Sequence, residues 1–202
     1  MLFRSDVTVT FVFDSSSNLA MQLQQGAGAD VLATADERTM GEAADVVEAP
    51  EVFATNRLAI AVAPGDPLGI QSLADLARPD LKVVLAAPEV PVGKYAVEAL
   101  DAQGITVEPV SYEATVKAVA TKGALGEADA GIVYVTDVTA AGDDIEGVTI
   151  PDEQNLVATY PIAVVSASES PEEARAFVDF VLSAEGQRIM QSYGFQPPSS
   201  VP

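Results

Sequence analysis

A serine triplet is the first stretch of the sequence whose residue types could do chemistry. It lies in Phe13-Asp14-Ser15-Ser16-Ser17-Asn18-Leu19, between a β-patterned run at 7–13 and a helix-patterned run at 19–25. Hydroxyls and backbone N–H groups at the positive end of a helix can hold an anion. Serine is also a common helix N-cap, so an anion site and a structural cap are both open on local grounds.

Three further strand or helix ends carry groups that could donate to an anion. PEVPVGKYA follows a buried strand pattern and opens a helix, with the N–H groups of Val92 and Gly93 at its start. YEATVK places Val116 at another helix start, and AGIVYVTD ends a strand at Tyr134. Each has a structural alternative, because a strand-to-helix loop or a rim tyrosine needs no ligand.

Composition excludes several function classes. The 202 residues include no Cys and no His, so disulfides, thiolate metal sites and a catalytic triad are ruled out. The net charge of −20 disfavours nucleic-acid partners, which require clustered cations. An enzyme would have to rely on carboxylates such as Asp30 and Asp36 or Asp143 and Asp144. Asp36 is better explained as a helix N-cap, and Asp143 and Asp144 as a solvated turn between glycines.

Strand and helix patterns alternate along the chain, which indicates an α/β fold with largely parallel sheets. Two apolar strands, 57–63 and 159–165, flank a self-contained central block and suggest two lobes. We expect one lobe from 1–60 plus 156–202, and the other from 61–155. The predicted strands are 6–13, 30–34, 57–63, 82–86, 106–110, 130–134, 147–150 and 159–165. The predicted helices are 17–25, 37–45, 73–77, 93–103, 113–121, 171–182 and 184–193.

The order of these motifs resembles the molybdate-binding solute receptors of bacterial ABC uptake systems. The matching segments are FDSSSNL, GAGADVLATAD, RLAIAVAP, PEVPVGKYAVEAL, ADAGIVYVTD and QSYGF, and they span nearly the whole chain. The resemblance implies a two-lobed periplasmic-binding-protein fold of type II, with mixed, mostly parallel sheets, whose lobes close on one tetrahedral oxyanion.

The resemblance also implies how the ligand is held and used. Ser16 would supply its hydroxyl and N–H from the first lobe, Val92 and Val116 their backbone N–H groups, and Tyr134 its phenolic O–H. The implied protein is a monomeric, extracytoplasmic receptor without a cofactor or a directly bound metal. It would bind molybdate, and also tungstate, and deliver the oxyanion to the permease of an ABC transporter in the membrane. A receptor for tungstate or sulfate remains an alternative.

The sequence departs from this pattern at its start. The family's first strand and helix, with a further ligand serine, and its secretion signal are absent before Asp6, and Met1–Ser5 resembles a truncation scar. We therefore expect a gap in the first lobe's sheet, low stability and weak molybdate binding by the chain as written. A nonfunctional fragment is a further alternative. Val92 also replaces a smaller residue, which matters little if only its N–H binds.

Overall fold

The computed structural model describes residues 7–198, which form two compact units. Unit 1 contains the described residues of Met1–Thr55 and Thr159–Pro202, and unit 2 is Asn56–Ala158. Two long strands, β2 (Glu51–Val62) and β7 (Val157–Val164), belong to both units, because the division falls within each of them. The α/β fold class predicted from the alternating pattern is confirmed. The lobe boundaries expected at residues 60 and 155 stay a prediction.

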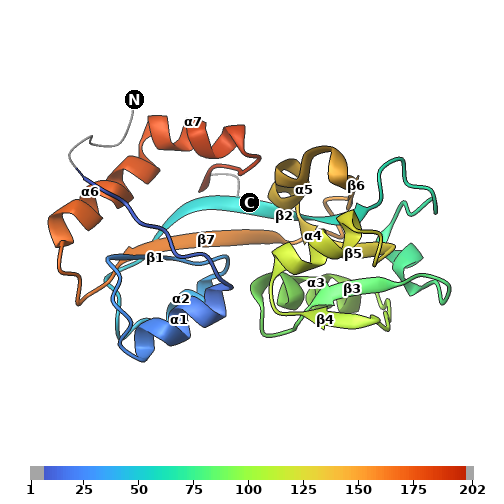
Figure 1. The fold of residues 1–202 in the computed structure, drawn as a ribbon, viewed down its shortest axis with the longest axis horizontal. Helices are drawn as coiled ribbons and strands as arrows, with labels where there is room; N and C mark the ends of the chain where they lie inside the picture. The colour runs from blue at the N-terminus through green and yellow to red at the C-terminus, as the bar shows by residue number, and fades with distance from the viewer. Residues whose placement is uncertain (1–6, 199–202) are drawn as a thin grey trace. The chain divides into compact units, whose positions relative to one another are not determined.

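Unit 1 packs short helices against a small antiparallel strand pair. Its elements are α1 (Ser16–Gln24), β1 (Val31–Ala33), α2 (Glu37–Glu42), α6 (Pro171–Leu182) and α7 (Ala184–Ser192). β1 pairs with β7, and α1 lies beside α2 (Figure 1). Small and apolar side chains form the core between them: Ala20, Leu23, Leu32, Met40, Ala43, Val47, Ala163 and Val165.

Unit 2 contains a mixed sheet with helices packed on it. Its strands are β3 (Val83–Ala86), β4 (Ser111–Glu113), β5 (Ala130–Tyr134) and β6 (Glu146–Thr149), together with most of β2. The helices are α3 (Pro91–Ala102), α4 (Val116–Ala124) and α5 (Val135–Ala141), with 3-10 turns η1 (Leu73–Ala77) and η2 (Gly142–Asp144). Both α3 and α4 pack against β3 and β5 (Figure 1).

The strand directions decide where the ends of the strands meet. β3 pairs in parallel with β4 and with β5, whereas β2 is antiparallel to β5 and β6, and β1 is antiparallel to β7. Parallel pairing therefore holds for the strands that alternate with α3 and α4, but not for the pairs made by the two long strands. Because β3, β4 and β5 run the same way, their carboxyl ends lie at one edge of the sheet.

The predicted strand at 6–13 is wrong for residues 7–13, which have no regular secondary structure; Asp6 lies outside the described residues. Phe11 is 59% exposed and Phe13 87% exposed. The alternating apolar pattern expresses only a local preference, and a strand also needs a neighbouring edge to pair with. Phe11 instead contacts Phe13 and Phe177 of α6, with ring centroids 5.8 and 6.3 Å apart.

Two other differences have local causes. The strand expected at 106–110 lies further along, at β4, because Pro109 cannot donate to a ladder. Pairing with β3 begins only at Val110, whose N–H donates to the carbonyl of Val83 at 2.8 Å. Helix α5 was not predicted, and its first turn depends on a side-chain contact described below.

Candidate functional site

The serine triplet builds the N-terminus of α1. Ser15 is the N-cap, and its Oγ accepts a hydrogen bond from the N–H of Asn18 at 3.3 Å. Ser16, the first helical residue, accepts the N–H of Ala35 on its Oγ at 3.0 Å. A hydroxyl that accepts one bond can still donate its proton, so Ser16 can offer both O–H and N–H to an anion. The structural cap and the candidate donor are thus adjacent serines.

The N-terminus of α3 presents backbone rather than side chain. Val90 is the N-cap and Pro91 the first helical residue, so the N–H of Val92 belongs to the first turn, where the helix itself supplies no acceptor. Val92 is only 1% exposed and its side chain is apolar, so only its backbone N–H could bind a ligand. Gly93 allows the helix to start close to the end of β3: a Cβ there would lie 2.1 Å from the carbonyl oxygen of Ala87.

The N-terminus of α4 also presents a backbone N–H, but a side chain caps it. Thr115 is the N-cap, and its Oγ1 accepts the N–H of Ala118 at 3.1 Å. Val116 follows as the first helical residue, with an N–H that the helix does not use.

A carboxylate close to Val116 is neutralised within the unit. Glu113, at the end of β4, lies 2.7 Å from the Nζ of Lys122 and 2.6 Å from the Oγ of Ser111. The ammonium of Lys122 and the hydroxyl of Ser111 hold the pKa of Glu113 below its usual range. The negative charge nearest to Val116 along the chain is therefore paired.

Tyr134 ends β5 and is also the N-cap of α5. Its side chain is 4% exposed, its phenolic oxygen is buried, and its backbone faces Leu58 of β2 in the antiparallel ladder. The N–H of Tyr134 donates to the Oδ2 of Asp137 at 2.9 Å. Burial raises the pKa of Asp137 to about 6, and the Tyr134 N–H bond opposes this rise. Asp137 was missed in the sequence, although an acid three residues after a strand end is a recognisable helix-start signal.

Within unit 2, the topology brings three of the predicted residues to one edge of the sheet. Val92 and Val116 lie in the first turns of the helices that follow β3 and β4, and Tyr134 is the last residue of β5. The parallel strands β4, β3 and β5 are neighbours, so all three candidate donors lie at their carboxyl edge. This edge is where open α/β sheets bind ligands. Ser16 lies in unit 1, at the N-terminus of α1.

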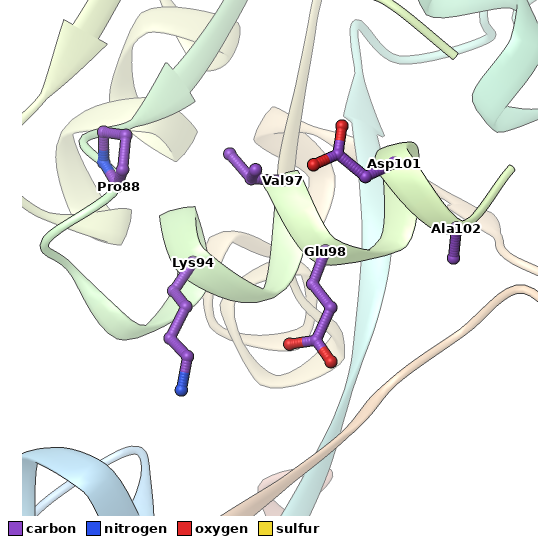
Figure 2. Close-up of a pocket in the computed structure, with 6 residues that line it drawn as sticks. All are labelled: Pro88, Lys94, Val97, Glu98, Asp101 and Ala102. Carbon is purple, nitrogen blue, oxygen red and sulfur yellow. The ribbon is translucent and has the colours of Figure 1, made fainter. Parts of the chain in front are cut away.

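A hollow in unit 2 is a different feature. It has a volume of about 580 Å³ and is lined mainly by α3, through Pro88, Lys94, Val97, Glu98, Asp101 and Ala102 (Figure 2). Figure 2 shows Lys94 and Glu98 extending from the same side of the helix. Its two carboxylates outnumber its one cation, so it does not suit an oxyanion. A second hollow, of about 310 Å³, lies in unit 1 beside α2 and does not include Ser16.

The carboxylates considered for catalysis have structural roles or are exposed. Asp36 is the N-cap of α2 and accepts the N–H of Thr39 at 2.7 Å, as the sequence predicted. Asp30 accepts the hydroxyl of Ser168 at 2.6 Å, and Asp143 and Asp144 are exposed in η2. Among residues 7–198, no group of three or more His, Cys, Asp or Glu side chains could hold a metal ion.

None of the helices in the described part of the chain is both long and apolar enough to span a membrane. The family of bacterial extracellular solute-binding proteins matches residues 4–196 of the chain.

Individual relatives agree with this match. A molybdate-binding protein of Mycobacterium tuberculosis is 43% identical over 195 residues, covering 95% of this chain and 75% of that protein. The solved substrate-binding domain of a putative molybdenum ABC transporter from Clostridium difficile superposes with a TM-score of 0.69 at 26% identity, covering 96% of this chain and 87% of that one. A sulfate-binding protein of M. tuberculosis has a TM-score of 0.77 at 21% identity, covering 92% and 75% of the two chains, and shares the fold. The chain belongs to the family of bacterial extracellular solute-binding proteins.

Proposed function

We propose that this protein captures molybdate outside the cytoplasm and delivers it to the membrane permease of an ABC transporter. The observation that carries the proposal is the 43% identity to a molybdate-binding protein over 95% of the chain. The protein would act as a monomer, without a cofactor, in the periplasm or as a lipoprotein at the cell surface. Tungstate, which is nearly the same size as molybdate, would bind as well.

The proposed donors are Ser16 in unit 1 and Val92, Val116 and Tyr134 in unit 2. All are neutral, which suits a protein of net charge −20, because oriented N–H and O–H dipoles can hold an anion without a cation. At Val92 and Val116 the donor is a backbone N–H at a helix N-terminus, where the helix dipole also favours negative charge.

The same donor set explains why phosphate would be rejected. Backbone N–H groups cannot accept a hydrogen bond, and the hydroxyls of Ser16 and Tyr134 are proposed to donate their protons to the oxyanion. A protonated phosphate would therefore place its own O–H where no acceptor is assigned, and an unmade buried hydrogen bond costs about 1–3 kcal/mol. Fully deprotonated oxyanions carry no such cost. Discrimination between molybdate and sulfate would depend on the size of the site.

Calorimetric titration of the purified protein with molybdate, tungstate, sulfate and phosphate tests the proposal. We expect molybdate and tungstate to bind tightly, and sulfate in large excess to fail to displace molybdate. Tyr134→Phe should weaken molybdate binding by about 1–3 kcal/mol, or roughly 5- to 150-fold, because it removes a donor to a charged group.

Tyr112→Phe is the matched control, because Tyr112 of β4 lies in the same unit and is 54% exposed. Its molybdate affinity should equal that of the wild type. Displacement of molybdate by an equal concentration of sulfate would replace the proposal with a sulfate receptor. An unchanged dissociation constant in Tyr134→Phe would remove Tyr134 from the site.

A further inference from the structure

The Tyr134 hydroxyl can serve as a donor only if the chain holds its ring in one orientation. Tyr134 stands at the junction where β5 ends and α5 begins, so its backbone is not held by a long regular element on both sides. Helix α5 is seven residues long, and its sequence, VTDVTAA, contains four β-branched residues with modest helix preference. The helix preference of these residues is therefore too weak to fix the junction, and other contacts must do so.

Side chains of unit 2 hold the junction from both flanks. On the helix side, the Oδ2 of Asp137 accepts the N–H of Tyr134 at 2.9 Å. The Nδ2 of Asn56, a residue only 1% exposed, donates to the Oγ1 of Thr136 at 2.7 Å.

On the strand side, Leu58 faces Tyr134 in the ladder and is itself fixed by Asn155. The N–H of Leu58 donates to the Oδ1 of Asn155 at 3.0 Å, and the Nδ2 of Asn155 donates back to the carbonyl of Leu58 at 2.9 Å. This pair of bonds imitates a further strand beside β2 at the level of Tyr134. Among these contacts, only that of Asp137 reaches Tyr134 directly through a side chain.

An acidic residue at position 137 is unexpected, because a carboxylate three residues from an anion donor repels the anion. The position of the Asp137 carboxylate explains its presence. It accepts the Tyr134 N–H and so closes the first turn of α5.

We infer that Asp137 is a positioning residue, which orients the Tyr134 hydroxyl toward the oxyanion by fixing the backbone of Tyr134. The inference rests on the proposed function of Tyr134 as a donor. Asn56 and Asn155 support the same junction indirectly, through Thr136 and Leu58. Asp137 acts through Tyr134 and does not touch the ligand.

A double-mutant cycle on molybdate affinity tests the inference. Asp137→Ala should weaken binding roughly ten-fold, within the range for misplacing one donor to a charged group. Asp137→Asn should stay close to the wild type, because its amide oxygen can still accept the Tyr134 N–H. In the Tyr134→Phe background, Asp137→Ala should have little further effect, because the hydroxyl that it positions is already gone.

The outcomes separate the inference from the proposed function. If Tyr134→Phe weakens binding and Asp137→Ala weakens it equally in both backgrounds, Asp137 acts independently and the inference is wrong. If Asp137→Ala leaves the affinity unchanged, the inference is also wrong, while the proposed function stands. If Tyr134→Phe itself has no effect, the assignment of Tyr134 fails, and the inference fails with it.

A ligand-free measurement covers the case in which binding is lost altogether. The chain has five tyrosines, so a spectrum of protein labelled at the tyrosine rings is simple, and Tyr134→Phe identifies one signal. Asp137→Ala should shift that signal, and Asp143→Ala, an exposed acid in η2, should not. If Asp137→Ala does not fold, Asp137→Ser is used instead. The serine side chain is shorter, so its oxygen does not reach the Tyr134 N–H as the carboxylate does. An unmoved Tyr134 signal overturns the inference.

Discussion

Asp137 should make the protein less stable as the pH rises from 5 to 7. Its pKa rises from an ordinary value of 3.8 to about 6 in the folded chain, because burial penalises the charged carboxylate. Between these two values the folded protein binds more protons than the unfolded one. The free energy of unfolding therefore falls as the pH rises through this window. One pKa unit corresponds to about 1.4 kcal/mol, so ionised Asp137 lowers the unfolding free energy by up to about 3 kcal/mol.

The window above pH 5 separates this residue from three other acids whose pKa values are shifted. The backbone N–H of Gln71 lowers the pKa of Asp75, the side chain of Arg78 lowers that of Asp80, and Lys122 and Ser111 lower that of Glu113. Their contributions have the opposite sign and are largely complete by pH 5, because they are gained as the unfolded carboxyls ionise. About 1.3 kcal/mol of the Asp137 effect lies between pH 5 and pH 7, from the linkage relation with the two pKa values.

Urea unfolding of the ligand-free protein at pH 5, 6 and 7 measures this effect. We expect Asp137→Asn to gain about 1.3 kcal/mol relative to the wild type over this range, because the amide does not ionise. Asp143→Asn removes the same formal charge at an exposed position and controls for the net charge. A constant difference between the wild type and Asp137→Asn from pH 5 to pH 7 would refute the reasoning.

Two further substitutions test the helix starts that present Val92 and Val116. Gly93→Ala should destabilise the protein by about 1–3 kcal/mol and weaken molybdate binding, because its Cβ would lie 2.1 Å from a backbone oxygen. Gly41→Ala is the control, because a Cβ at Gly41 of α2 would lie in open space, and it should change neither property. Urea unfolding measures the stability and calorimetry the affinity. Thr115→Ala should cost about 1 kcal/mol of stability and weaken molybdate binding, whereas Thr115→Ser should keep both. A stable, tightly binding Gly93→Ala, or a Thr115→Ala indistinguishable from Thr115→Ser, would contradict these expectations.

Local signals were sufficient wherever an element is defined by its own residues. Strand 130–134 and helix 171–182 were predicted with the bounds of β5 and α6. Asp36 was predicted as an N-cap and is one. In each case the responsible interaction joins residues a few positions apart, so the sequence contains the whole cause.

Local signals failed where the cause is distant or tertiary. Residues 7–13 have the composition of a strand but no strand structure, because pairing depends on a neighbouring edge rather than on the segment itself. Helix α5 has weak intrinsic preference, and it is supported by Asn56, eighty positions from its partner Thr136 along the chain. The convergence of Val92, Val116 and Tyr134 on one sheet edge needed the parallel order of β4, β3 and β5, which spacing alone does not reveal.

Because the chain is acidic, the positions of its carboxylates matter for the proposed anion site. An acid lies close in sequence to each of the four proposed donors: Asp14 before Ser16, Glu89 before Val92, Glu113 before Val116, and Asp137 after Tyr134. Asp14 accepts the N–H of Ser15 at 2.7 Å and the side-chain amide of Asn18 at 3.0 Å.

Glu113 and Asp137 are engaged in different ways. Glu113 is paired with the ammonium of Lys122, which lowers its pKa, so its charge is compensated locally. Asp137 accepts the N–H of Tyr134, but burial raises its pKa, so one hydrogen bond compensates its charge only in part. In the proposed site, oriented N–H and O–H dipoles would therefore have to hold the dianion against a chain of net charge −20 without a cation.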